Sequence, residues 1–201
     1  MTSQRISRRK LLQAAGAGLV AGVAAPLLSS HACAAEKRKV LIAYYSRTGT
    51  TREFASQIQK SVGGDLFELQ TTHSYPKEYR ATTNQAKREQ EANFRPLLTA
   101  NVPNIESYDR VFIGYPNWWG TLPMAFFSFL ESHRFAGKTV TPFCTHEGSG
   151  LGRSVGDLQS LCPKATILEG LALRGGGIDN VQNESARREV ALWLKKIGMT
   201  A

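Results

Sequence analysis

From residue 38 onward, short runs of apolar, β-forming residues alternate with segments of helical periodicity. Residues 39–45 (KVLIAYY) and 110–115 (RVFIGY) are continuous apolar runs, a pattern typical of strands buried on both faces of a sheet. Strands that alternate with helices pair in parallel through right-handed crossovers. The alternation therefore predicts one α/β domain with a doubly wound, five-stranded parallel sheet and helices on both faces. We expect strands at 39–45, 65–70, 110–115, 138–144 and 166–173. We expect helices at 50–62, 77–93, 122–133 and 180–197, and one more that follows the loop 145–152 and ends near residue 161.

Residues 1–35 have the three-part plan of a secretory signal. A basic stretch ends at Arg8-Arg9-Lys10, an apolar run rich in Ala and Gly continues to Leu28, and Ala32-Cys33-Ala34 matches an Ala-x-Ala cleavage site. The paired arginines, which follow a serine, resemble the twin-arginine export signal. We therefore expect residues 1–35 to be a cleaved signal peptide and residues 36–201 to be the mature domain. The mature protein would be periplasmic or otherwise exported through the twin-arginine pathway.

An uncleaved membrane anchor is the alternative for this segment. The apolar run from 11 to 28 reaches the ~18 residues at which a helix can span a bilayer. Its alanines and glycines are only weakly hydrophobic, and Pro26 interrupts it, so cleavage is favoured. We do not expect the mature domain to span a membrane.

The mature domain is mildly basic. Four of the 25 Lys and Arg residues and none of the 16 Asp and Glu residues lie in residues 1–35, which leaves 21 basic residues against 16 acidic ones. No block of Lys and Arg with interleaved aromatic residues occurs, so nucleic acid is not an expected partner.

In an open doubly wound sheet, ligands bind beyond the carboxyl ends of the strands, where the strand order reverses. For the order 2-1-3-4-5, this point lies between strands 1 and 3 and beside strand 4. The loops that matter are therefore those that follow Tyr45, Tyr115 and Cys144.

The first of these loops is Ser46-Arg47-Thr48-Gly49-Thr50-Thr51. Its hydroxyls and its glycine stand where a strand leads into a helix, whose unpaired N–H groups and positive dipole end suit a phosphate. The loop lacks the Gly-Lys-Ser/Thr of a Walker motif and the G-x-G-x-x-G of a dinucleotide site. A hydroxyl-rich helix cap without a ligand is the alternative interpretation.

The second loop is Pro116-Asn117-Trp118-Trp119-Gly120. Two adjacent indoles between Pro and Gly are not both expected in the core, and an exposed indole suits stacking on a flat conjugated ring. We expect one indole to pack and the other to stack, and we prefer Trp118 for stacking.

The third loop is Thr145-His146-Glu147-Gly148-Ser149-Gly150. Its small residues allow backbone groups to approach the edge of a flat ligand closely. The histidine is either a donor to such a ligand or a solvated loop residue, and the glutamate is expected to face solvent.

Together, the patterns Tyr-Ser-x-Thr-Gly-x-Thr, Gly-Tyr-Pro-x-Trp-Trp-Gly and Thr-x-x-Gly-Ser-Gly resemble the flavodoxin family over nearly all of residues 38–197. Within that family they are similar to the branch found in exported or fused bacterial proteins. The resemblance implies a flavodoxin-like fold with FMN as the cofactor. Residues 46–51 would then hold the FMN phosphate, and residues 116–120 and 145–150 would clasp the two sides of the ring. The chain departs from the family in its basic charge and in Arg47, a cation that would raise the reduction potential of a nearby flavin.

The function implied by the resemblance is that of an FMN-binding electron-transfer flavoprotein of the cell envelope. Its partner would be a redox protein or a small-molecule quinone. Two alternatives stay open: an NAD(P)H-dependent quinone or FMN reductase on the same fold, and a flavin-free binding or scaffold protein. No side chain is assigned as a general acid or base, and the scattered histidines do not predict a metal site. Cys144 and Cys162 are not expected to pair, because the helix between them spans about 15 Å and a disulfide needs Cα atoms within about 7 Å.

Overall fold

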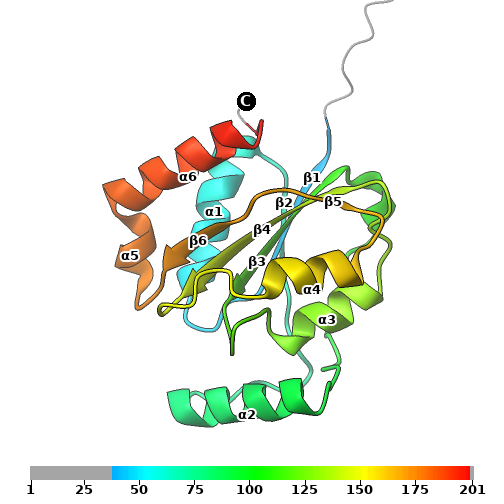
Figure 1. The fold of residues 1–201 in the computed structure, drawn as a ribbon, viewed down its shortest axis with the longest axis vertical. Coiled ribbons are helices and arrows are strands. Elements are labelled where there is room, and N and C mark those ends of the chain that lie inside the picture. Colours follow the sequence, from blue (N-terminus) through cyan, green and yellow to red (C-terminus); the bar gives the residue numbers. More distant parts are fainter. Residues whose placement is uncertain (1–37, 200–201) are drawn as a thin grey trace, which may run out of the picture. The chain divides into compact units, whose positions relative to one another are not determined.

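The computed structural model describes residues 38–199, so the expected signal peptide lies outside the described residues. Residues 38–199 form a six-stranded sheet in the order β2-β1-β3-β4-β5, with β6 also paired to β4 (Figure 1). Every strand pair in it is parallel. The predicted doubly wound sheet and its strand order are confirmed. The strands are β1 (Val40–Tyr44), β2 (Asp65–Glu68), β3 (Arg110–Pro116), β4 (Thr139–His146), β5 (Thr166–Ile167) and β6 (Leu171–Arg174).

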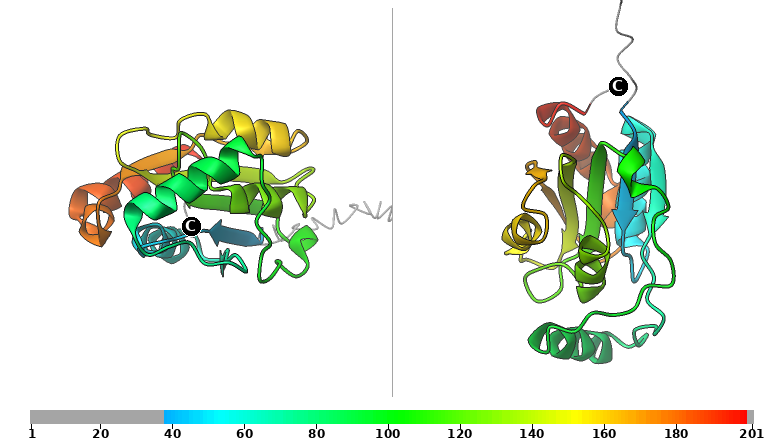
Figure 2. Two further views of the ribbon diagram at one scale, coloured as in Figure 1. Left: turned by 90° about the horizontal axis from the view of Figure 1, so that it is seen from below. Right: turned by 90° about the vertical axis from the view of Figure 1, so that its right-hand side faces the viewer.

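Two apolar cores lie on opposite faces of the sheet, because successive side chains of a strand point to opposite sides. Leu41 of β1 belongs to the core that includes Phe126 and Leu158, whereas Ile42 belongs to the core that includes Phe54 and Trp193. The first core is covered by α3 (Met124–Glu131) and α4 (Ser154–Leu161), and the second by α1 (Thr50–Val62), α5 (Ile178–Gln182) and α6 (Glu184–Lys196) (Figure 2). A short 3-10 helix, η1 (Ile105–Ser107), precedes β3. Within residues 38–199, no helix combines the length and the hydropathy needed to cross a bilayer.

The last strand was predicted as one run, 166–173, but the structure divides it into β5 and β6. The hydrogen bond from Leu168 N to Val140 O shows that the even-numbered residues of β4 direct their backbone groups toward this edge. Pro142 is the next even-numbered residue and has no N–H group to donate there. The ladder is interrupted opposite Pro142 and resumes where Leu171 pairs with Phe143.

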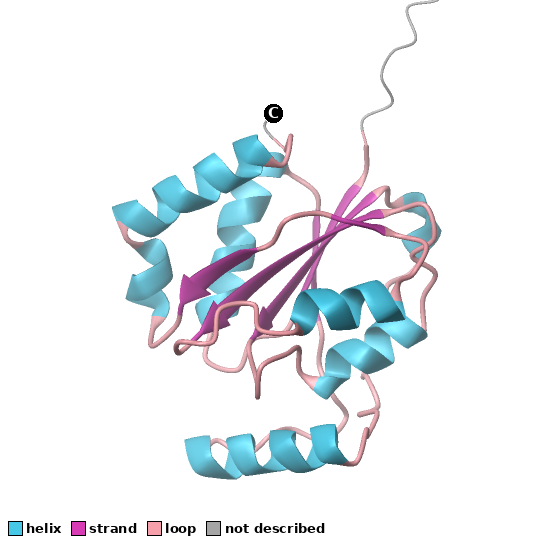
Figure 3. Ribbon diagram, in the orientation of Figure 1, coloured by secondary structure: helices cyan, strands magenta, loops and turns pink. Residues whose placement is uncertain are grey.

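The final helix, predicted as 180–197, is also divided. Asn183 ends α5 and begins α6, and its Oδ1 accepts a hydrogen bond from Ala186 N at 2.9 Å. An Asn side chain that caps the first turn of a helix competes with continuation of the preceding one. The remaining boundaries lie within a few residues of those predicted. Figure 3 distinguishes the helices, strands and loops by colour.

Residues 70–99, which we call the α2 excursion, carry α2 (Tyr79–Glu91) away from both faces of the sheet (Figures 1 and 2). The two ends of the excursion pair in antiparallel fashion through the hydrogen bonds Thr72 N to Leu97 O and Thr99 N to Gln70 O, each 2.9 Å long. Seen from below, α2 crosses in front of the carboxyl ends of the strands (Figure 2). The sequence predicted a helix at 77–93 but gave no position for it.

Candidate functional site

A cleft of ≈ 280 Å³ lies beyond the carboxyl ends of β1, β3 and β4. All three loops that were expected to form a site contribute residues to its walls. The structure thus brings these loops together at the edge of the sheet that the topological rule indicated. Eleven of the expected residues line this cleft: Arg47, Thr48, Thr50, Thr51, Pro116, Asn117, Trp118, Trp119, Thr145, His146 and Glu147.

The other six expected residues belong to the same loops but lie outside the lining. Hydrogen bonds tie them into the loops: for example, Ser46 Oγ accepts a hydrogen bond from Arg52 N at 3.2 Å, and Gly150 O accepts one from Asn117 Nδ2 at 2.8 Å. Direct contact of these six residues with a ligand stays a prediction. They are Ser46, Gly49, Gly120, Gly148, Ser149 and Gly150.

The start of α1 presents a cradle of unpaired backbone donors. Within residues 38–199, the N–H groups of Thr48, Gly49, Thr50 and Thr51 have no hydrogen-bond partner, and the N-cap residue, Gly49, has no side chain that could bond them. Gly49 has φ +91°, a left-handed conformation that a glycine adopts without strain. Free N–H groups at the positive end of a helix dipole, next to two threonine hydroxyls, fit a phosphate group.

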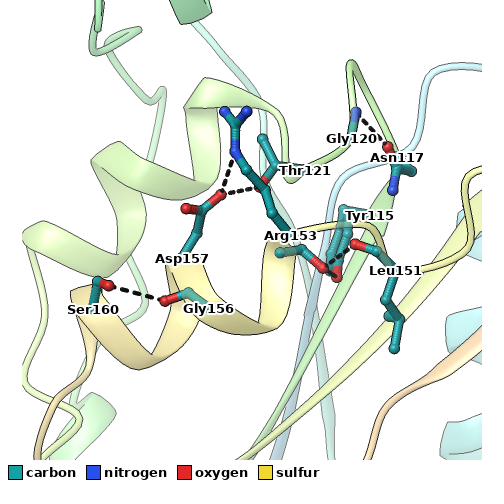
Figure 4. A network of polar contacts seen from close by, with 10 residues as sticks. Tyr115, Asn117, Gly120, Thr121, Leu151, Arg153, Gly156, Asp157 and Ser160 are labelled. Atoms are coloured by element: carbon teal, nitrogen blue, oxygen red, sulfur yellow. Dashed lines mark hydrogen bonds and ion pairs between the residues drawn. The ribbon is translucent and has the colours of Figure 1, made fainter.

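Side-chain hydrogen bonds join the walls of the cleft to one another. Asn117 links the second loop to the third, since its Nδ2 donates to Gly150 O. Its Oδ1 accepts from Gly120 N at 3.0 Å (Figure 4). Thr51 Oγ1 and Thr145 Oγ1 lie 3.0 Å apart and connect the start of α1 to the end of β4. The three loops therefore form one connected frame.

The two indoles have different surroundings. Trp118 is half-buried, and its ring lies edge-on to Tyr45 and Tyr75, with centroid distances of 5.4 and 4.9 Å. Trp119 is 48% exposed, has φ +53° and donates its Nε1–H to Thr83 O at 2.8 Å. One indole packs and one is accessible, as expected. The preference for Trp118 as the stacking residue stays a prediction, and the exposure of the two rings favours Trp119.

His146 has a defined hydrogen-bonding role. Its Nδ1 accepts from Gly148 N at 2.9 Å, so a neutral ring carries its proton on Nε2. Nε2–H is then available as a donor at the cleft wall, which His146 lines. Glu147 also lines the cleft and is exposed, as expected for a residue that faces solvent.

Five residues of the lining were missed by sequence reasoning. Gly175 and Gly176 follow β6, and the carboxyl end of β6 lies next to that of β4. Their place directly after the last predicted strand was the signal that could have identified them. The other three, Tyr79, Thr82 and Thr83, come from α2, and no local sequence pattern points to them.

The two described cysteines are free and buried. Burial raises the pKa of the Cys144 thiol to about 12 and that of the Cys162 thiol to about 11. Both thiols are therefore protonated at neutral pH, and a thiol has little reactivity compared with a thiolate.

The residues present fit a flavin mononucleotide. The unpaired amides at the start of α1 suit its phosphate, while the exposed indole of Trp119 and the backbone near residue 146 offer surfaces for a flat ring.

Comparisons with known proteins agree with this fold. The flavodoxin family model matches residues 39–197. A solved structure of a candidate flavoprotein from Bacteroides eggerthii DSM 20697 is 33% identical, covers 80% of this chain and 98% of its own, and has a TM-score of 0.68. A similar protein from Bacteroides uniformis ATCC 8492 is 31% identical, with 79% and 98% coverage and a TM-score of 0.68.

A flavoprotein in complex with FMN from Lactobacillus acidophilus NCFM is 21% identical, with 67% and 93% coverage and a TM-score of 0.59, and is similar in fold. No curated protein matches the chain. Because the family model covers most of the chain and the sheet has the expected strand order, the chain belongs to the flavodoxin family.

Proposed function

We propose that the protein binds FMN in the cleft and functions as an electron-transfer flavoprotein of the cell envelope. The observation that carries the proposal is the row of unpaired amides from Thr48 to Thr51, which opens onto a cleft that also contains an exposed indole. The FMN complex of the Lactobacillus acidophilus flavoprotein, which shares the fold, supports the choice of ligand. The envelope location rests on the signal predicted in residues 1–35.

In this proposal, different residues of the cleft bind different parts of FMN. Residues 48–51 hold the phosphate, Trp119 packs on the ring, and the frame around Asn117 fixes the distance between the walls. Bound FMN would supply one- and two-electron redox chemistry. Arg47 lines the same cleft, and a fixed positive charge favours a reduced flavin that carries negative charge. The proposed protein is therefore not a carrier of very low potential.

The direct test is to purify the full chain, record its visible spectrum and identify the released cofactor. Comparison of FMN with riboflavin, which lacks the phosphate, tests the amide cradle. One charge-assisted hydrogen bond contributes ~1.5–3 kcal/mol, so FMN should bind at least about tenfold more tightly than riboflavin. A colourless protein that fails to bind added FMN would refute the proposal and favour a flavin-free binding or scaffold protein.

An NAD(P)H-dependent quinone or FMN reductase is the second candidate. It is favoured by α2, whose residues Tyr79, Thr82 and Thr83 wall the cleft and suit a small substrate. Anaerobic mixing of the FMN-loaded protein with NADPH separates the two candidates. Rapid bleaching of the flavin, with turnover when a quinone is added, indicates the reductase, whereas an unchanged spectrum indicates the carrier.

A further inference from the structure

The amino ends of the strands form the edge of the sheet opposite the cleft, and this edge is rich in cations. Lys39 and Lys138 directly precede β1 and β4, and Arg110 begins β3. Because these strands pair in parallel, the three residues share one edge. The crossover helices return to the same edge, so Lys60 in the last turn of α1 and Lys195 in that of α6 also lie there. We call this set the basic edge: Arg38, Lys39, Lys60, Arg110, Arg134, Lys138, Lys164, Lys195 and Lys196.

The basic edge carries the whole positive excess of the described domain. Residues 38–199 contain 20 Lys and Arg residues and 15 Asp and Glu residues. Nine of the cations and four of the anions lie at the basic edge, so the other described residues balance, with 11 of each sign. The pair of Arg95 with Glu131, at the end of α3, adds no net charge to either group. The four anions at the edge are Asp65, Glu106, Asp109 and Glu169.

Most of these cations are available to a partner. Lys138 is buried and bonded to two backbone carbonyls, and Lys196 pairs with Glu169 at 2.6 Å. Arg110 is half-buried and its Nε has no hydrogen-bond partner within residues 38–199. Burial and the nearby Arg38 lower the pKa of Arg110, so an anion at this edge would stabilise its charged form. The exposed cations that form no ion pair within residues 38–199 are Arg38, Lys39, Lys60, Arg134, Lys164 and Lys195.

The chemistry of the basic edge suits a lipid surface better than a protein or a nucleic acid. Protein interfaces centre on aromatic and other apolar side chains, and single-stranded nucleic acids stack on aromatic rings. The exposed aromatic rings of residues 38–199, Tyr79, Phe94 and Trp119, lie on or beside α2, at the other end of the domain (Figure 2). A bilayer with anionic headgroups needs no such centre, since it attracts Lys and Arg near its surface.

The connection of the chain also favours a membrane. Residue 38 enters the domain at the basic edge, directly before Lys39 and β1. The segment that precedes it is the one expected to engage a membrane during export. The eight residues of β4 span roughly 26 Å. A bilayer at the basic edge therefore leaves the cleft, at the opposite end of the sheet, open to solution.

We infer that the basic edge binds the anionic surface of a lipid bilayer and holds the cleft facing away from it. The inference goes beyond the proposed function, because it concerns the opposite end of the sheet and needs no bound FMN. The attraction is between Lys and Arg side chains and lipid phosphates, so it weakens as salt shortens the Debye length.

Two triple variants with the same change of charge test the inference. The edge variant is Lys60→Gln/Lys164→Gln/Lys195→Gln, and the control is Lys77→Gln/Arg80→Gln/Arg88→Gln, which removes three exposed cations on or beside α2. The probes are vesicles of equal parts phosphatidylglycerol and phosphatidylcholine, and vesicles of phosphatidylcholine alone, in a sedimentation assay.

The assay uses residues 36–201, because residues 1–35 would bind vesicles through their own cations and apolar run. This form keeps every strand and both apolar cores. Urea unfolding compared with that of the full chain checks that it folds. If it does not, the full chain of each variant is used, since residues 1–35 are then common to all the proteins compared.

We expect the wild type to bind the anionic vesicles and not the neutral ones. Each Lys near the surface contributes about fivefold to binding, so the edge variant should lose about tenfold to a hundredfold. The control should stay within about twofold of the wild type, because α2 lies farther from the edge than a Debye length of about 10 Å. Without FMN, acrylamide should quench the emission of Trp119 as strongly in bound as in free protein, because the cleft faces solution.

Four results would overturn the inference. They are a wild type that ignores the anionic vesicles, equal losses in the two triple variants, shielding of Trp119 from acrylamide in the bound protein, and binding of soluble polyglutamate through the edge lysines without binding of vesicles. The last result would assign the edge to an acidic protein. FMN binding by the edge variant should equal that of the wild type, since none of its three lysines lines the cleft. A wild type that binds vesicles but no FMN would refute the proposed function alone.

Discussion

Two glycines between β4 and α4 offer a matched test of how the walls of the cleft are held together. Gly150 and Gly152 have φ values of +58° and +57°, so an alanine at either position adopts a left-handed conformation, at a cost of about 1–2 kcal/mol. Their surroundings differ. A Cβ on Gly150 has no atom within 4 Å, whereas a Cβ on Gly152 would lie 2.2 Å from Gly120 O. The pair therefore separates backbone strain from steric overlap.

The overlap sets the expected magnitude. Gly152→Ala must push Gly120 away, which strains the loop by ~1–3 kcal/mol, as overpacking does. The movement also disrupts the hydrogen bond of 2.8 Å from Arg153 N to Gly120 O, and such a bond contributes ~0.5–1.5 kcal/mol. The free energy of unfolding should therefore fall by about 2–4 kcal/mol more in Gly152→Ala than in Gly150→Ala.

Urea unfolding of the full chain without FMN, followed by far-UV circular dichroism, measures this difference. FMN affinity, measured separately, should also fall further in Gly152→Ala, because Gly120 ends the loop that carries the two indoles. Equal losses of stability in the two variants would refute the reasoning. The close approach of Gly152 to Gly120 would then not be a steric link between the loops.

Two further predictions concern ionisable groups. The hydrogen bond from Arg95 lowers the pKa of Glu131, so their pair stabilises the native state at neutral pH and this contribution is lost as the pH falls through that lowered pKa. Between neutral pH and about pH 3, the free energy of unfolding measured in urea should fall less in Arg95→Ala than in the wild type. The difference between the two proteins should be under ~1 kcal/mol, because the pair is exposed. The raised pKa values and the burial of Cys144 and Cys162 predict that a Cys33→Ser chain does not react with iodoacetamide near pH 8 until urea unfolds it. Labelling of the folded chain would contradict this.

The sheet and the place of the cleft could be predicted because they depend on local patterns and on one topological rule. Runs such as 39–45 and 110–115 are apolar after their first residue, and the structure buries 40–45 and 111–115 on both faces of the sheet. Once strands and helices alternate, the order of the sheet determines which loops meet. The prediction therefore needed no knowledge of side-chain contacts, and it identified most of the residues that line the cleft.

The division of the last strand into β5 and β6, and of the last helix into α5 and α6, could not be predicted. In each case a single residue interrupts a pattern that is otherwise typical of one continuous element. Pro142 lies in an otherwise good strand and removes an N–H group on the side that faces β5 and β6. Its effect appears on the neighbouring strand, about 25 residues later in the chain. Asn183 is an ordinary polar residue in a polar helix, and only its bond to Ala186 N identifies it as a cap.

The position of α2 was missed for a different reason. Its buried residues are Thr82, Ala86 and Glu89, which are small or polar and give no apolar stripe to indicate a packing face. A helix of this kind is expected at the surface, and most of its residues are indeed exposed or half-buried. What places it over the cleft is a set of contacts between residues distant in sequence.

Those contacts give the adjacent indoles a shared role. On the buried side, the Tyr75 hydroxyl donates to Glu89 of α2, and the Tyr75 ring packs against Trp118. Burial and the neighbouring Glu89 raise the pKa of Tyr75, so the phenol keeps its proton and remains a donor at neutral pH. On the exposed side, Trp119 donates directly to Thr83 O of the same helix. Each indole is thus tied to α2 by a different route. The choice between packing and stacking that the sequence posed is therefore incomplete, because the Trp118-Trp119 pair also fastens α2 to the site.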